Sequence, residues 1–277
     1  MWVGQQLADG LDFWGFLGSL ILGGIILGIY TGLLGYVGAK TGLSLDLLSQ
    51  RAFGEKGSYL PSAMTSFTQI GWFGVGSFVS GGTATPNFAR FAKNGKSGAI
   101  TTVVAFFIGN SLMFFFGAVS SIFVGGNDIF EVMVRLNLFY LAVLVLGLNI
   151  WTTNDNALYT AGLGLANIFH QRKKPMVLLS GIIGTVASVW LYYNFCGWLN
   201  ILNCTLPPVG MILVLAYFMN KEDFETDQPK LKTVDWFAVA GVILGAIVAN
   251  LLHWDIASIN GMVVAAVCYC VGQAVNK

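Results

Sequence analysis

The chain alternates between long apolar runs and short polar loops. Eight apolar segments can be marked, most of them long enough to cross a bilayer as a helix, which takes about 20 residues. The eight segments are 13–39, 57–89, 97–124, 136–168, 176–195, 197–220, 236–254 and 256–276. They are too apolar and too long for the alternating strands of a membrane barrel. The pattern predicts an all-α integral membrane protein with about eight apolar segments, some of them broken helices.

Details within the runs refine this prediction. The charge-free run 175–220 is long enough for two helices, with a turn expected near residues 195–197. The segment 136–168 is predicted to be one long helix that carries a single acid, Asp155. The pair Pro207-Pro208 is expected to break the segment 197–220, because proline removes a helical hydrogen bond.

Composition supports a membrane protein and excludes several other classes. Charged residues make up 10% of the 277 residues, against about 25% in soluble domains, and hydrophobic residues make up 56%. A soluble fold of this size cannot bury so much apolar surface. The net charge of +1 argues against a nucleic-acid partner. The sequence has no phosphate-binding loop, nucleophile elbow or metal motif, so an enzyme is not expected, and no obligate protein partner is indicated.

Positive charges near helix ends mark the cytoplasmic side. Strict alternation of the eight segments places the basic loops 90–96, 169–175 and 221–235 on one face, together with Lys277. The loop 40–56, with three basic residues, then falls on the opposite face. This loop contradicts the simple topology.

If the loop 40–56 is also cytoplasmic, the segment 57–89 has both of its ends on one side. A single crossing cannot achieve this. The segment could form a re-entrant hairpin, or it could join two half-spans whose intervening helices are missing. Alternatively, the charge rule is statistical and one loop disobeys it.

A polar block interrupts the segment 136–168 at residues 149–156. Asn149, Thr152, Thr153 and Asn156 share one helical face, flanked by Asp155, while Asn154 points elsewhere unless the helix bends. An acid at membrane depth is a functional hypothesis by default. Amide and hydroxyl oxygens suit a cation such as sodium, and Asn and Asp can pair with the edge of a small polar ring. Hydrogen bonding between helices is the structural alternative.

A glycine-rich stretch, residues 68–82, is the second candidate site. Glycines permit unwound helix, which a membrane tolerates only where it lines a cavity. Trp72 and Phe78 offer flat faces for stacking, and Ser77 and Ser80 offer hydroxyls. Close helix packing, with the aromatic side chains facing lipid, explains the composition equally well.

Tryptophans stand near the ends of several segments. Trp14, Trp198 and Trp236 are examples. Such positions are typical of anchors at the membrane–water interface, and we expect these side chains to lie there.

Several stretches together resemble the cytosine permease group of the nucleobase–cation symporter family. The matching stretches are 28–31, 34–42, 69–76, 109–114, 146–159, 182–185 and 207–210. The block Asn149–Tyr159 is the most specific of them, and the resemblance extends over essentially the whole chain.

The resemblance implies a fold similar to LeuT-type transporters, which have twelve helices, ten of them in two inverted repeats. It implies import of cytosine across the inner (cytoplasmic) membrane by sodium-coupled symport, with substrate and ion at broken helices midway through the bilayer. The protein would thus have a nucleobase as its ligand and the lipid bilayer as its environment.

The resemblance also assigns roles to residues of this sequence. Trp72 and Phe78 would stack on the two faces of the nucleobase. Hydrogen bonds to the base would come from Ser77, Ser80, Gly81 and Asn154, with Asp155 beside them. The sodium site would include Asn149, Thr152 and Thr153.

The chain departs from the family pattern in length. Residues 1–277 would form one transporter domain that is incomplete relative to the family, a partial LeuT-like bundle with a junction near residues 74–78. There, the start of helix three would be joined directly to the end of helix six. Two alternatives follow: a shortened homologue or fragment that does not transport, or a transporter for another purine, pyrimidine or hydantoin.

Overall fold

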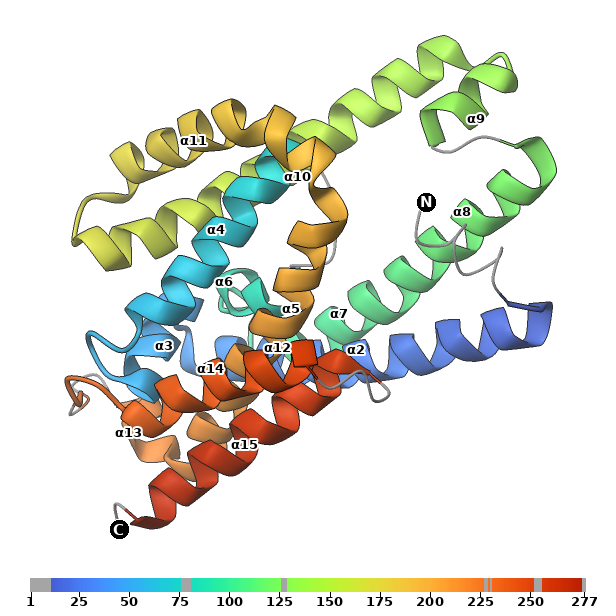
Figure 1. Ribbon diagram of the computed structural model, residues 1–277. Coiled ribbons are helices and arrows are strands. Elements are labelled where there is room, and N and C mark those ends of the chain that lie inside the picture. Colours follow the sequence, from blue (N-terminus) through green and yellow to red (C-terminus); the bar gives the residue numbers. More distant parts are fainter. Residues whose placement is uncertain are drawn as a thin grey trace.

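Every regular element that the structure describes is a helix. The structure is a computed structural model, and it describes residues 11–75, 81–125, 129–226, 229, 231–251 and 256–275 (Figure 1). The long helices are α2 (Phe13–Thr41), α4 (Tyr59–Val75), α8 (Asn110–Val124), α10 (Phe139–Phe169), α11 (Lys173–Tyr193), α12 (Phe195–Met219), α14 (Trp236–Leu251) and α15 (Ala257–Val275). The shorter helices are α3 (Leu45–Phe53), α5 (Gly81–Ala84), α6 (Pro86–Ala89), α7 (Gly95–Val103), η1 (Val104–Gly109), α9 (Ile129–Arg135) and α13 (Lys221–Glu225).

Five helices among the described residues are long and apolar enough to cross a membrane. They are Phe13–Thr41, Gly95–Val124, Lys173–Leu191, Gly197–Met219 and Ala257–Val275, and each lies in one of the eight predicted segments. The segment 236–254 holds the shorter apolar helix Trp236–Leu251. The segment 136–168 forms a single helix, α10, as predicted, but its polar block lies in the middle of the helix. Among the described residues, five of the eight predicted segments thus hold a helix of spanning length and composition.

The helix α12 corrects one prediction and confirms another. A turn at Asn194 separates α11 from α12, close to the expected position. The prediction of a break at Pro207-Pro208 is wrong, because α12 continues through both prolines. Membrane helices tolerate proline where neighbouring helices compensate. Here Pro208 packs against the glycines Gly245 of α14 and Gly261 of α15.

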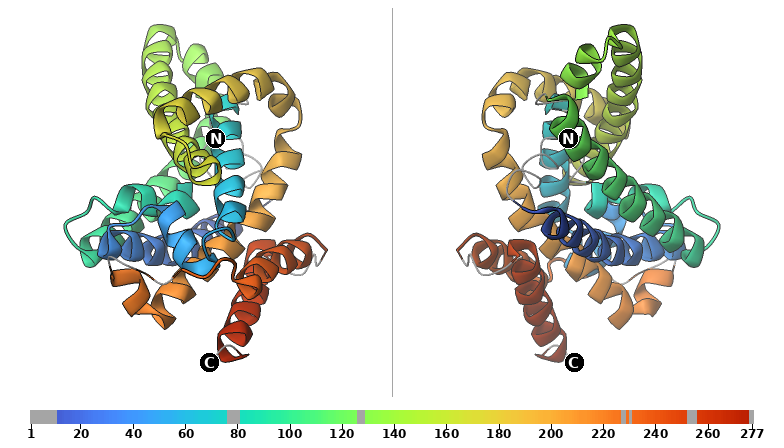
Figure 2. Two further views of the ribbon diagram at one scale, coloured as in Figure 1. Left: turned by 90° about the vertical axis from the view of Figure 1, so that its left-hand side faces the viewer. Right: turned by 90° about the vertical axis from the view of Figure 1, so that its right-hand side faces the viewer.

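The main hydrophobic core lies where α2, α3, α12, α14 and α15 meet (Figures 1 and 2). Leu34, Phe53, Ile212 and Tyr217 are among its fully buried side chains. Close approach depends on small residues: a side chain at Gly210 of α12 would run into the Tyr30 ring of α2. Small-residue contacts of this kind are typical of membrane helices.

A second cluster corrects the prediction for one tryptophan. Trp198 was expected at the membrane interface, but its side chain is 2% exposed and packs with Leu191, Leu202 and Leu206. Its ring lies directly against Gly71 of α4, where any side chain would clash with it. Trp198 therefore fills the space that glycine leaves between α4 and α12.

One part of the molecule projects from this packed body. Figure 1 shows α8, α9 and the first half of α10 extending away from the other helices. We call α8, α9 and residues 139–151 of α10 the arm. Its apolar side chains are largely exposed, including Phe123 at 83%, Tyr140 at 88% and Trp151 at 65%.

The start of α3 lies close to the end of the segment 57–89. The backbone N–H of Leu45 donates to Oδ1 of Asn87 at 2.8 Å, and Gly38 packs against Pro86. The loop after α2 and the turn at α6 are therefore neighbours. This proximity is expected for a hairpin or a join, and the exception to the charge rule stays a third explanation.

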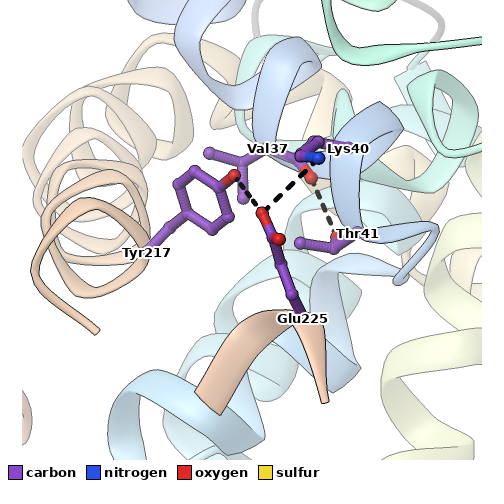
Figure 3. Close-up of polar contacts among 5 residues, drawn as sticks. All are labelled: Val37, Lys40, Thr41, Tyr217 and Glu225. Carbon is purple, nitrogen blue, oxygen red and sulfur yellow. Dashed lines mark hydrogen bonds and ion pairs between the residues drawn. The ribbon is translucent and has the colours of Figure 1, made fainter. Parts of the chain in front are cut away.

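Glu225 of α13 contacts both α12 and the C-terminal end of α2 (Figure 3). The hydroxyl of Tyr217 donates to Glu225 Oε1 at 2.9 Å, and Lys40 Nζ lies 3.8 Å from the same oxygen. In α2, the Thr41 hydroxyl donates to the Val37 carbonyl at 2.8 Å. Glu225 thus links the end of α2 to α12.

Candidate functional site

The largest described cavity lies beside the C-terminal half of α10. Its volume is about 660 Å³, within the usual range of about 300–1,000 Å³ for small-molecule sites. Its walls come from α4, the α5–α6 region, α7 with η1, and α10. Segments distant in the sequence therefore meet around one space.

Polar groups line this cavity from several elements, with three each from α7 (Ser97, Thr101 and Thr102) and α10. Gln69 comes from α4, and Thr153, Asn156 and Thr160 come from successive turns of α10. The Oγ1 atom of Thr160 is buried and has no hydrogen-bond partner among the described residues. A buried hydroxyl without a partner costs free energy, so it is a group that a polar ligand can satisfy.

The rest of the wall is largely apolar. Phe88 of α6 and Phe106 of η1 contribute aromatic rings, while Ala84, Ala89 and other small residues leave room. Lys93 and Ser97 lie at the cavity from the α6–α7 loop and the start of α7. An apolar cavity with a few converging amides and hydroxyls can hold a small polar ring and fix its orientation.

The structure divides the predicted polar stripe of α10. Thr153 and Asn156 line the cavity. Asn149, on the arm, and Thr152, directly after it, are exposed. The Thr152 hydroxyl bonds to its own helix, to the carbonyls of Leu148 (3.2 Å) and Asn149 (3.1 Å). The face is continuous, but it extends beyond the end of the cavity.

The neighbouring predicted residues lie in different surroundings. Asp155 is exposed. Asn154 is partly buried, and its Oδ1 atom has no partner among the described residues. Neither residue lines the described cavity.

Most of the candidate site residues in the glycine-rich stretch, residues 68–82, lie outside the residues that the structure describes. Ser77, Phe78 and Ser80 lie outside the described residues, as does the side chain of Trp72, whose backbone belongs to α4. Gly81 begins α5. Their predicted roles stay predictions.

Several cavity residues were not predicted as site residues. Thr160 continues the stripe one turn beyond Asn156, so the same helical spacing could have indicated it. Gln69 lies beside the glycine-rich stretch and is a polar residue in an apolar run, which was also a usable signal. Phe88 and Phe106 carry no such signal, because their position depends on how α6 and η1 pack.

Several apolar helices of spanning length, packed around a cavity with a few polar groups, define a multi-span membrane protein with a small-molecule site. Comparison with known sequences agrees. The pattern of the family described as "Permease for cytosine/purines, uracil, thiamine, allantoin" matches residues 1–84 and 74–272. The chain belongs to this family; it is a membrane permease and not an enzyme.

Two relatives illustrate the range of the family. The chain is 36% identical to the cytosine permease of Escherichia coli (strain K12), over 98% of this chain and 86% of that protein. It is 34% identical to the allantoin permease of Bacillus subtilis (strain 168), over 30% of this chain and 16% of that protein.

The alignment with the cytosine permease is longer than this chain. It covers 364 positions and the chain has 277 residues, so at least the difference, 87 positions, stands opposite gaps in this chain. That length corresponds to about four membrane helices of some 20 residues each. The family pattern is also matched in two pieces that meet at residues 74–84.

Proposed function

We propose that the protein is a nucleobase importer that takes up cytosine together with sodium. The observation that supports the proposal best is the cavity beside α10, where amides and hydroxyls from α4 and α10 converge between apolar and aromatic walls. A nucleobase presents flat faces and an edge of donors and acceptors, which such a site complements. The similarity to a cytosine permease over 98% of the chain favours cytosine among the bases.

The proposed mechanism is alternating access in a partial LeuT-like bundle. Binding of sodium and nucleobase would shift the population towards a closed form, because both ligands bind that form more tightly. Asn149, Thr152 and Thr153 are the proposed sodium ligands, and Trp72, Ser77, Phe78, Ser80, Gly81, Asn154 and Asp155 remain proposed substrate contacts. To these the cavity adds Asn156 and Thr160.

Uptake of labelled cytosine into cells that lack their own transporter tests the proposal. We expect uptake that needs sodium and that falls at least tenfold in Asn156→Ala, because one lost amide pair leaves its partner unsatisfied. Thr205→Val is the matched control. Thr205 lies on α12 away from the cavity, and its hydroxyl bonds only to its own helix, to Ile201 O at 2.8 Å.

The gap in the alignment favours a second candidate, a shortened homologue that binds but does not transport. A third concerns the substrate, because the family description includes other bases and allantoin. Calorimetric titration of purified protein with cytosine, with and without sodium, separates these outcomes. Binding with uptake supports the importer, and binding without uptake supports the shortened homologue. Tighter binding of another base changes the substrate, and absence of both binding and uptake contradicts all three.

A further inference from the structure

A buried carboxyl group lies outside the cavity, on the short helix α3. Asp46 is 5% exposed, and the hydroxyl of Ser62 on α4 donates to its Oδ1 at 2.6 Å. None of the ion pairs found among the described residues includes Asp46. A buried acid that has a hydrogen bond but no salt bridge calls for a specific explanation.

The hydrogen bonds around Asp46 all run in one direction. Gln50 Nε2 donates to Asn167 Oδ1 at 2.6 Å, and Asn167 Nδ2 donates to the hydroxyls of Ser58 (3.1 Å) and Ser62 (2.9 Å). Since the Ser62 oxygen accepts from Asn167, its own proton points to Asp46. The series of donors therefore ends on a carboxylate that only accepts, and it fits the ionised form of Asp46.

Burial acts against that ionised form. Gly164 of α10 packs over the carboxyl group, where even a single added carbon would touch Asp46 Oδ1 and Ser66. Burial raises the pKa of Asp46 to about 6, against the opposing effects of the Ser62 hydrogen bond and the positive charge of Arg90. Both protonation states are consequently accessible near neutral pH.

Most of the charged and titratable groups on the elements around Asp46 have partners of their own, while Asp155 of α10 is exposed. Arg90 is bonded to the hydroxyl of Tyr159 on α10. Tyr59 of α4 pairs with His170, which directly follows α10, at 2.7 Å. Arg51 on α3 donates to the carbonyl of Asp223 on α13. Glu225 is bonded to Tyr217 and lies near Lys40, and Asp235, just before α14, is paired with Lys232.

We propose that Asp46 is a proton-binding site that controls how tightly α3 is held against α4 and α10. In the ionised form, the carboxylate completes the network through Ser62 and Asn167. When a proton from water binds to the other carboxyl oxygen, Oδ1 can still accept from Ser62, but this hydrogen bond loses the charge that strengthens it. The last hydrogen bond of the network is then weakened and the connection between the three helices loosens.

The position of this network gives the proton an effect beyond α3. The helices α4 and α10 carry Gln69, Thr153, Asn156 and Thr160 into the cavity, and α3 is the connection between α2 and α4. Proton binding at Asp46 would thus act on the packing of two helices that line the cavity with polar groups. The site itself does not depend on which ligand, if any, the chain transports.

Infrared spectroscopy of the full chain in lipid nanodiscs, with aspartate labelled by 13C at the carboxyl group, tests the proton site directly. We expect a carbonyl band of a protonated carboxyl to grow between pH 8 and pH 5, with its midpoint near 6, and to be absent in Asp46→Asn. Asp235→Asn is the matched control. Asp235 is also 5% exposed, but Lys232 pairs with it at 3.1 Å and it caps α14, so its loss should leave the band in place.

A second variant keeps the test decisive if Asp46→Asn does not fold. Ser62→Ala removes the donor to the carboxylate and should move the midpoint upward by about one pH unit. An unmoved midpoint, or a band that persists in Asp46→Asn, would overturn the assignment. Hydrogen exchange tests the loosening: after correction for intrinsic rates, α3 amides should exchange faster at pH 5 than at pH 8, and equal rates would overturn that part.

Discussion

The two halves of α10 have similar local sequence character but opposite surroundings. In the C-terminal half, Ala157, Thr160 and Ala161 are buried against α4 and its neighbours. In the N-terminal half, Tyr140, Leu144 and Trp151 are at least 60% exposed and belong to the arm. Hydropathy does not separate the halves, since both are rich in apolar residues.

Glycine contacts show what separates them. At Gly162 and Gly164 an added side chain would meet α11 or α4, whereas at Gly147 it would meet nothing within 4 Å. One half of the helix is thus held by close packing and the other is not. The difference teaches that an apolar run predicts a helix, while only its neighbours decide whether that helix is buried.

The largest effect is expected from a pair of tryptophans. Trp198→Ala empties the contact with Gly71 and should lower the stability by about 3–5 kcal/mol, as for other buried aromatic residues. Trp151→Ala, on the exposed half of α10, should change it by less than about 0.5 kcal/mol. Thermal midpoints in one detergent measure both, and equal losses would show that the exposed half of α10 is packed as tightly as Trp198 of α12.

A smaller contrast is expected within α10 itself. Gly164→Ala forces a carbon against Ser66 and the Ser62 carbonyl and should cost about 1–3 kcal/mol. Gly147→Ala should gain up to about 1 kcal/mol, because alanine favours helix and nothing obstructs it. The two midpoints should therefore move in opposite directions, and a shift of both in one direction would show that the arm is packed.

The next pair compares two threonines of α10. Thr160→Val removes a buried hydroxyl without a described partner and should stabilise the protein by about 1 kcal/mol while weakening cytosine binding. Thr152→Val removes a hydroxyl that bonds to its own helix, so the stability of this variant should stay close to that of the unchanged protein. A loss of stability in Thr160→Val would indicate that its hydroxyl has a structural role.

The smallest effects are expected from exposed ion pairs. Glu225→Gln in the body and Glu131→Gln in the arm each weaken a pair, Lys40 with Glu225 at 3.8 Å and Arg135 with Glu131 at 2.6 Å. Each should cost less than about 1 kcal/mol at low salt and almost nothing at high salt. Repeating the melts at both salt concentrations checks this, and a loss that persists in high salt would identify a structural contact.

Much of the fold could be predicted from the sequence, for local reasons. The long helix α10, the turn between α11 and α12 and the helical nature of every described element follow from apolar periodicity and length. The unusual position of the loop 40–56, which its basic residues indicate, stays a prediction. The burial of Trp198 was not predictable, because it depends on Gly71, more than a hundred residues away.

The candidate site could be predicted in part. The polar block of α10 was evident, since amides and hydroxyls are rare in apolar helices, and two of its members line the cavity. The length of the cavity along α10 was not evident, so Thr160, one turn beyond the predicted block, was missed. The aromatic walls at Phe88 and Phe106 depend on tertiary packing.

The hydrogen bond between Leu45 and Asn87 has a consequence for how such a chain can change in evolution. Since Leu45, before the segment 57–89, lies beside Asn87, near its end, an even number of crossings can be inserted or deleted between these two residues without inverting any later helix. Removal of one complete crossing would reverse the orientation of everything that follows, including the basic loops. A protein that gains or loses an even number of crossings can differ from a relative by many residues and still insert its remaining helices in the same orientation.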